Sequence, residues 1–142
     1  MKLQIVTSVI SFVISFVIVR PYLSGNSKME TPKNYPSNET ALVNRIAERL
    51  KKKYGARLWV LKVHGNQYQR KGVPDLFICF EGRFIAFEIK HRKPGESIQR
   101  IYKRVSDLQQ LEMEGISAAG GIARMCWLEE QVMTAVSASV EI

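Results

Sequence analysis

The sequence predicts an α/β domain in which a mixed sheet is flanked by helices, in the element order αβββαβα. Three observations predict this class. An amphipathic helical pattern follows residue 38, two short apolar runs then meet at Glu81-Gly82, and a helical pattern, a strand pattern and a second helical pattern complete the chain. This alternation is typical of one sheet with helices packed on its faces.

The first helix is expected to begin near Glu39 and to end before Gly55, with Ser37 or Asn38 as its cap. Its apolar positions recur at helical spacing and consist of Leu42, Val43, Ile46, Ala47 and Leu50. Glu39 lies at the end of this stripe. We therefore expect its carboxylate to face the core rather than water.

Three strands are expected next, at residues 57–64, 75–80 and 83–90, with a polar loop at 65–72. If Glu81-Gly82 forms a two-residue hairpin loop, Asp75 lies directly opposite Glu88, and Lys90 points to the same side. A three-residue loop with a bulge would change this register.

The carboxyl-terminal part is expected to contain a helix, a strand and a closing helix. After Pro94-Gly95, apolar residues at 98, 101, 105, 108 and 111 predict one helix. Residues 121–127 read as a strand and residues 128–136 as the last helix. Two cysteines, Cys79 and Cys126, lie in apolar runs without metal-ligand spacing, so both are expected to be small core residues in a reducing compartment.

The amino-terminal part differs from the rest in composition. Residues 1–28 form an apolar segment, residues 29–37 a linker, and residues 38–142 the predicted domain. The apolar run at 3–19 is interpreted either as a signal anchor or as an extension upstream of a true start at Met29. The domain is expected to be cytoplasmic in both cases. A membrane is a partner only if residues 3–19 are translated and inserted.

The charge is strongly positive and unevenly distributed. The chain has 21 Lys and Arg against 13 Asp and Glu, a formal net charge of +8. This excess favours a polyanionic partner such as nucleic acid or an anionic membrane surface. The charged residues at 45–71 are nine basic residues against the single acid Glu48, and the charged residues after 105 are mainly acidic. One side of the molecule is therefore expected to be basic and the other acidic.

The predicted hairpin places charged side chains at its open end. Two opposed carboxylates, Asp75 and Glu88, repel each other unless something positive lies between them. Hard oxygen ligands favour Mg²⁺ or Mn²⁺. Lys90 could then activate water or stabilise charge on a phosphate. The alternative is a structural ion pair at the rim of the sheet, with Lys90 neutralising one carboxylate.

These motifs resemble the VRR-NUC family of the PD-(D/E)XK nuclease superfamily. The resemblance rests on "GVPD", "FEIK", the helix that presents Glu39 and a Gln-bearing helix before "GGIA", and it covers residues 39 to about 136. It implies a restriction-endonuclease-like fold. It also implies that Glu39, Asp75, Glu88 and Lys90 are the catalytic and metal-binding set, with the carbonyl of Ile89 as a further ligand.

Two further features of the family are matched. Arg70 and Gly72 in "RKGVPD" match the residues that lead to the Asp, and Gln109 matches the catalytic Gln. Gln99 is a rival for that Gln, because the segment after Lys90 is longer than expected.

The resemblance implies a Mg²⁺-dependent or Mn²⁺-dependent endonuclease that cleaves DNA. Branched DNA or a Holliday junction is the expected substrate, in replication, repair or recombination, and a homodimer of phage or bacterial origin is the expected enzyme. RNA as a substrate is left open. The alternative is a non-catalytic, basic nucleic-acid-binding module with a nuclease-like fold. The candidate DNA contacts are Lys52, Lys53, Arg70, Lys71, Arg92 and Lys93.

Overall fold

Four strands form one open mixed sheet in the order β1-β2-β3-β4. They are β1 (Leu58–Lys62), β2 (Leu76–Phe80), β3 (Arg83–Ile89) and β4 (Ile122–Cys126). The first two pairs of neighbours are antiparallel, and β3 and β4 are parallel. The predicted α/β fold class is therefore confirmed. Strand β1 is shorter than predicted because residues 55–57 form a 3₁₀ turn, η1.

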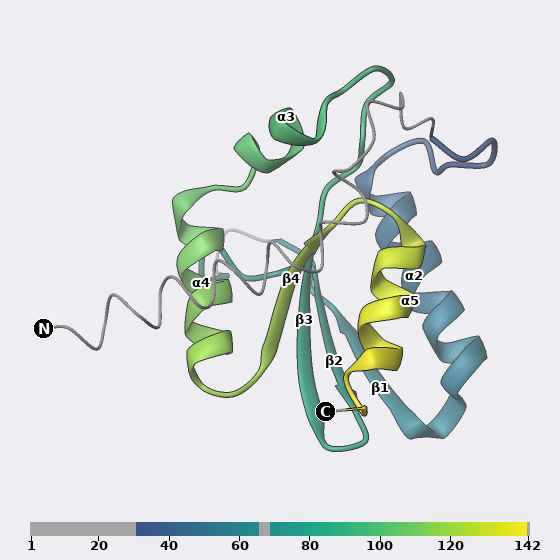
Figure 1. Ribbon diagram of the computed structural model, residues 1–142, viewed down its shortest axis with the longest axis vertical. Coiled ribbons are helices and arrows are strands. Elements are labelled where there is room, and N and C mark those ends of the chain that lie inside the picture. The colour runs from purple at the N-terminus through teal and green to yellow at the C-terminus, as the bar shows by residue number, and fades with distance from the viewer. Residues whose placement is uncertain (1–30, 66–68, 142) are drawn as a thin grey trace, which may run out of the picture. The chain divides into compact units, whose positions relative to one another are not determined.

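The computed structural model describes residues 31–65 and 69–141 (Figure 1). The predicted anchor at 3–19, the start at Met29 and the beginning of the linker lie outside the described residues. Within the described ranges, no helix is both long enough and apolar enough to span a bilayer.

Helices cover both faces of the sheet (Figure 1). α2 (Glu39–Tyr54) and α5 (Glu129–Ala138) pack on one face, and α4 (Asp107–Ala118) packs on the other. The larger core lies under α2 and α5. It contains Leu42, Ile46, Leu50, Leu76, Ile78, Phe80, Ile85, Phe87, Ile89 and Val132.

α2 begins and ends where the sequence predicts. Of the two candidate caps, Asn38 is the one used, because its Oδ1 accepts a hydrogen bond from Ala41 N at 2.9 Å. At the other end Gly55 has a φ of +55°, and its N–H donates to Lys51 O. A positive φ is readily adopted by glycine, so the helix stops here.

The helix predicted over residues 98–111 is divided into α3 (Ile98–Lys103) and α4. Ser106 starts the second helix through a reciprocal cap: its Oγ accepts from Gln109 N, and Gln109 Oε1 accepts from Ser106 N. Leu108 and Leu111 consequently lie on the exposed side of α4. The apolar spacing continues across the break, so periodicity alone did not reveal it.

The β2–β3 hairpin has the predicted register. Glu81 and Gly82 both have positive φ values, +49° and +78°, as two-residue loops matched to strand twist require. Phe80 pairs with Arg83 and Leu76 with Phe87, without a bulge. Extending this register by one residue places Asp75 opposite Glu88.

Cys126 is buried in the core as predicted, but Cys79 is exposed. The prediction for Cys79 was wrong because α4 does not cover the part of the sheet to which β2 contributes this residue. Both cysteines are free thiols.

The predicted separation into a basic and an acidic side also needs correction. Arg45 pairs with Glu129 at 2.7 Å, and Arg49 pairs with Glu130 at 2.5 Å. These ion pairs join α2 to α5, because the two helices pack side by side on one face of the sheet (Figure 1). Basic and acidic segments therefore partly neutralise each other.

Candidate active site

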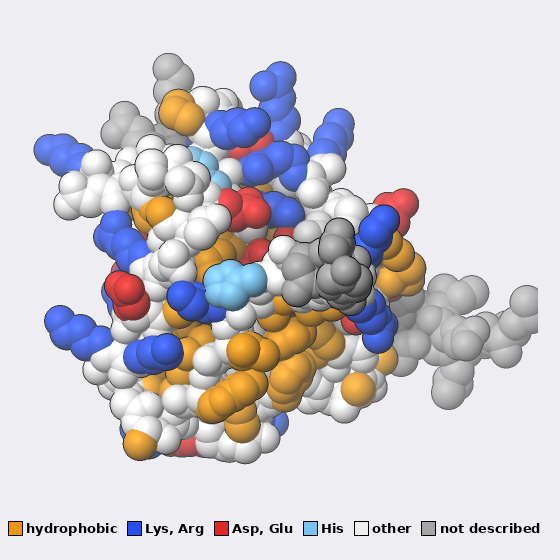
Figure 2. All heavy atoms as spheres, turned by 180° about the vertical axis from the view of Figure 1, so that it is seen from behind, with side chains coloured by type: hydrophobic (Ala, Val, Ile, Leu, Met, Phe, Trp, Pro, Cys, Tyr) orange, Lys and Arg blue, Asp and Glu red, His pale blue; other side chains and the backbone are white. Residues whose placement is uncertain are grey.

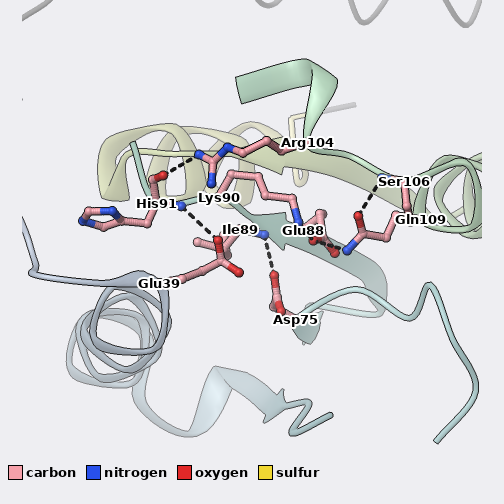
Figure 3. A network of polar contacts seen from close by, with 9 residues as sticks. All are labelled: Glu39, Asp75, Glu88, Ile89, Lys90, His91, Arg104, Ser106 and Gln109. Carbon is pink, nitrogen blue, oxygen red and sulfur yellow. Dashed lines mark hydrogen bonds and ion pairs between the residues drawn. The ribbon is translucent and has the colours of Figure 1, made fainter. Parts of the chain in front are cut away.

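Asp75 precedes β2 directly, at the open end of the hairpin. Its Oδ2 accepts a hydrogen bond from Ile89 N at 2.7 Å, across the strand pair (Figure 3). Its carbonyl accepts from Val63 N on the other side, at 2.8 Å. The backbone of the three strands therefore fixes the position of this carboxylate.

Glu88 lies near the end of β3 and is 1% exposed. Its Oε1 accepts hydrogen bonds from Lys90 Nζ at 2.6 Å and from Gln109 Nε2 at 2.5 Å. The rival Gln99 is exposed on α3. The structure therefore brings Gln109 to the predicted site.

Gln109 reaches Glu88 because α4 begins close to the loop before Asp75. Gly72 in that loop has a φ of +84°, and a Cβ there would come within 2.6 Å of the Leu108 backbone. Only glycine permits so close an approach. The Gly in "RKGVPD" therefore has a packing role that links Asp75 to the start of α4.

Glu39 lies at the first turn of α2 and faces the end of β3 (Figure 3). Its Oε2 accepts from His91 N at 3.1 Å. Its negative charge is near enough to raise the pKa of both Asp75 and Glu88. Glu39 was expected to face the core rather than water; it is partly buried, and its observed contact is with backbone.

The pKa values of two carboxyl groups are raised by their surroundings. Burial raises the pKa of Glu88 to about 7, and the charge of Asp75 adds to this while Lys90 opposes it. Burial also raises the pKa of Asp75, against the hydrogen bond from Ile89. Glu88 pairs with Lys90, and the charges of Asp75 and Glu39 both act to raise the pKa of Glu88.

The donor set of this cluster fits a hard divalent cation. Glu88 Oε2 is buried and has no hydrogen-bond partner, which is costly unless another positive group binds it. Within residues 31–65 and 69–141, no three His, Cys, Asp or Glu side chains converge on one metal position. Mg²⁺ commonly uses only one or two carboxylates and completes its shell with water and phosphate oxygens. Asp75 and Glu88 meet that requirement; metal binding by Glu39 and by the Ile89 carbonyl stays a prediction.

The segment after Lys90 is held by a partly buried network that the sequence did not reveal. Arg104 donates to the carbonyl of His91 and to Glu96 Oε2, and Glu96 also accepts from Lys93 N at 2.9 Å. Tyr35 bridges the segment to the residue after β4: its hydroxyl accepts from Arg92 N at 3.0 Å and donates to Trp127 O at 2.6 Å. The His91 peptide is thus held on one side by Arg104 and on the other by Glu39.

The six predicted DNA contacts lie in different settings. Lys71 and Lys93 are exposed in the loops on either side of the acidic cluster. Lys52 and Lys53 are exposed near the far end of α2, roughly 20 Å from Glu39 by helical rise. Arg70 is exposed and pairs with Glu112.

Arg92 requires a correction. It is 7% exposed, and its Nε donates to Glu96 O at 3.1 Å. The guanidinium therefore stabilises the loop after β3, where the sequence had suggested a phosphate contact. Its neighbour Lys93 is exposed.

No protein-family model, curated protein or solved structure matches this chain. The likeness to the VRR-NUC family therefore depends on the motifs and on the geometry they adopt.

Proposed function

We propose that this protein is a metal-dependent nuclease that hydrolyses DNA phosphodiester bonds in the cytoplasm, of the VRR-NUC type. One observation carries the proposal. Glu88 is fully enclosed, one of its oxygens has no partner, and Asp75, Lys90 and Gln109 are arranged around it at one end of the hairpin. A structural ion pair would need only Lys90.

Asp75 and Glu88 are the residues that would hold Mg²⁺ or Mn²⁺. The bound ion supplies Lewis acidity toward a phosphate oxygen and a lowered pKa of coordinated water. The chain keeps both carboxylates oriented before the ion binds, because Asp75 is held by Ile89 N and Glu88 by Gln109. Preorganised ligands cost no rearrangement during the reaction.

Lys90 supplies the positive charge next to the reacting phosphate. Its Nζ is 2.6 Å from Glu88 Oε1, and its backbone N–H donates to Cys126 O at 2.9 Å. The side chain thus leaves the sheet at a fixed place. It stabilises negative charge that develops on the phosphate, or it orients the attacking water. Gln109 and Glu39 act beside it by holding Glu88 and the His91 peptide.

The net charge of +8 supports a nucleic-acid substrate. Lys71 and Lys93, on the two loops that border the cluster, provide contacts that do not depend on base identity. We therefore propose selection of a DNA structure, such as a branch, during replication, repair or recombination.

The proposal is tested by incubating the full chain with duplex, flap and four-way junction DNA and with RNA, in Mg²⁺, in Mn²⁺ and in EDTA. We expect metal-dependent cleavage of branched DNA that Asp75→Asn abolishes. Cleavage that persists in EDTA or in the variant would contradict the proposal. Metal-independent binding without cleavage by the wild type would instead identify a binding module.

A further inference from the structure

A small cavity lies next to the candidate site, between the loop after β3 and α3. Its volume is about 420 Å³, and the residues that line it are Lys93, Pro94, Gly95, Glu96, Arg100 and Arg104. The first four belong to the loop that follows Lys90, and the last two lie on α3 and directly after it. A volume of this size is within the range of small-ligand sites. We call it the loop cavity.

The wall of the loop cavity has an excess of positive charge. It carries three cations against the single carboxylate of Glu96. That carboxylate is 8% exposed and already occupied, since its Oε2 accepts from Lys93 N at 2.9 Å and from Arg104 Nη2 at 3.1 Å. Arg104 therefore neutralises Glu96. The charges of Lys93 and Arg100 are left over.

The two remaining cations are available to a ligand. Across residues 31–65 and 69–141, neither the Lys93 nor the Arg100 side chain has a hydrogen bond or an ion pair, and both are exposed. One comes from the loop and the other from α3, yet they line the same cavity. In Figure 2, Lys and Arg side chains gather at the top of the view, the end of the molecule where Figure 1 shows α3.

A buried charge adjoins this wall. Arg92 is 7% exposed, and its Nε donates to the carbonyl of Glu96 at 3.1 Å. No carboxylate in the described part of the chain pairs with its guanidinium. Burial of a cation without a counter-charge is costly. An anion in the loop cavity, on the other side of Glu96, would offset part of that cost.

A phosphate suits both the charge and the position of the loop cavity. Guanidinium and ammonium groups are common phosphate ligands in proteins. Lys93 is three residues beyond Lys90, so their backbones lie at most roughly 10 Å apart. A DNA strand covers that distance in about three nucleotides, at roughly 3.4 Å of rise each. Arg104 also ties the cavity wall to the peptide next to Lys90, because it donates to the carbonyl of His91.

We propose that the loop cavity binds a second, non-reacting phosphate of the nucleic-acid strand that is cut, through Lys93 and Arg100. The inference rests on the proposed nuclease function and adds a specific phosphate subsite to it. Such a contact fixes the register of the strand without reading its bases. The phosphate belongs either to the interior of the strand or to its end, and the substrates described below distinguish these two sources.

Titration of the full chain with inorganic phosphate, without divalent metal, tests the cavity independently of cleavage. Phosphate should raise the free energy of unfolding in a saturable manner. Arg100→Gln removes one charge-assisted contact and should weaken phosphate binding by about tenfold or more. Lys103→Gln is the matched control, because Lys103 is exposed on the same helix but does not line the cavity. It should bind phosphate as the wild type does.

Cleavage of DNA that carries one methylphosphonate, and hence one uncharged linkage, identifies the source of the phosphate. One such linkage, no more than about three nucleotides from the cut, should lower kcat/KM of the wild type by about tenfold and leave that of Arg100→Gln unchanged. A second set of substrates lacks the terminal phosphates. If only their removal has this effect, the cavity binds the phosphate of a strand end.

The proposal is overturned if the wild type does not bind inorganic phosphate, or if Arg100→Gln binds it as well as the wild type does. Equal losses in Arg100→Gln and Lys103→Gln would also overturn it, as would DNA in which no single phosphate affects the wild type alone. Phosphate binding by a protein that cleaves no DNA would refute the nuclease function and confirm the anion site. If Arg100→Gln does not fold, Lys93→Gln takes its place.

Discussion

The two ends of the β2–β3 hairpin each carry an ion pair, and the two pairs differ in how deeply they are buried. At the loop, Arg57 and Glu81 have side chains that are 64% and 37% exposed. At the open end, Lys90 and Glu88 have side chains that are 10% and 1% exposed, with Asp75 and Glu39 nearby. Each pair joins one basic side chain to one glutamate. Water screens the first and not the second, so only the second is costly to maintain without a further ligand.

The largest expected effect comes from removing a carboxylate at the buried end. Asp75→Ala or Glu88→Ala should lower DNA cleavage by about a thousandfold or more, on the order of 4 kcal/mol in activation free energy. Binding should be unchanged or tighter, because a negative charge leaves a phosphate-facing site. Single-turnover cleavage and a binding titration in Ca²⁺ measure the two effects. Unchanged turnover in either variant would reduce the buried pair to a structural one.

Gln109 both holds Glu88 and takes part in the Ser106 cap of α4, and two variants separate these roles. Gln109→Glu preserves an acceptor for the Ser106 cap but places a carboxylate against Glu88, so cleavage should fall by about a hundredfold with α4 intact. Ser106→Ala should cost about 1 kcal/mol of unfolding free energy and leave cleavage unchanged. Kinetics and urea unfolding of both variants provide the measurement. If both variants lose activity and stability in proportion, Gln109 acts only through the cap.

Glu39→Gln should reduce cleavage by about tenfold or more, roughly 1.4 kcal/mol in the barrier. The amide keeps an oxygen that can accept from His91 N, so unfolding free energy should change little. A cleavage assay at several Mg²⁺ concentrations checks this prediction. If the Glu39→Gln variant is as active as the wild type at low Mg²⁺, the role of Glu39 is limited to holding the backbone after β3.

The smallest effect is expected at the loop end. Glu81→Gln removes one partner of the exposed pair and should change unfolding free energy by less than about 1 kcal/mol, with cleavage unaffected. Urea unfolding at low and high salt measures this change. A larger loss would mean that burial does not distinguish the two ends.

The sequence predicted the fold and the hairpin register because both follow from local patterns. Strand alternation and a two-residue Glu-Gly loop were enough to align Asp75 with Glu88. The sequence did not reveal that a new helix begins at the Ser106 cap, because the spacing of the apolar residues continues through the break.

Long-range features were beyond the sequence. The network around Arg92 and Glu96 includes Tyr35, which comes from a distant segment, and Arg104, which lies beyond an irregular loop and a short helix. Alternation showed which strand residues share a face, but it could not show that the helices at residues 31–65 and 69–141 leave one half of a face uncovered. Cys79 was assigned to the core for that reason.

The most direct test of the central account compares the unfolding free energies of the wild type and Asp75→Asn, each with and without Mn²⁺. Without metal, the raised pKa values mean that the folded protein binds more protons than the unfolded chain between about pH 4.5 and 7. Wild-type stability should therefore fall as pH rises through this range. Asp75→Asn should be the more stable protein above pH 7, because it relieves repulsion with Glu88 and leaves Lys90 paired.

Addition of Mn²⁺ should then stabilise the wild type and leave Asp75→Asn nearly unchanged. A cation site therefore predicts that Mn²⁺ reverses the order of stability of the two proteins. A structural ion pair predicts the opposite: Asp75→Asn would be less stable than the wild type at pH 8, and Mn²⁺ would affect neither protein.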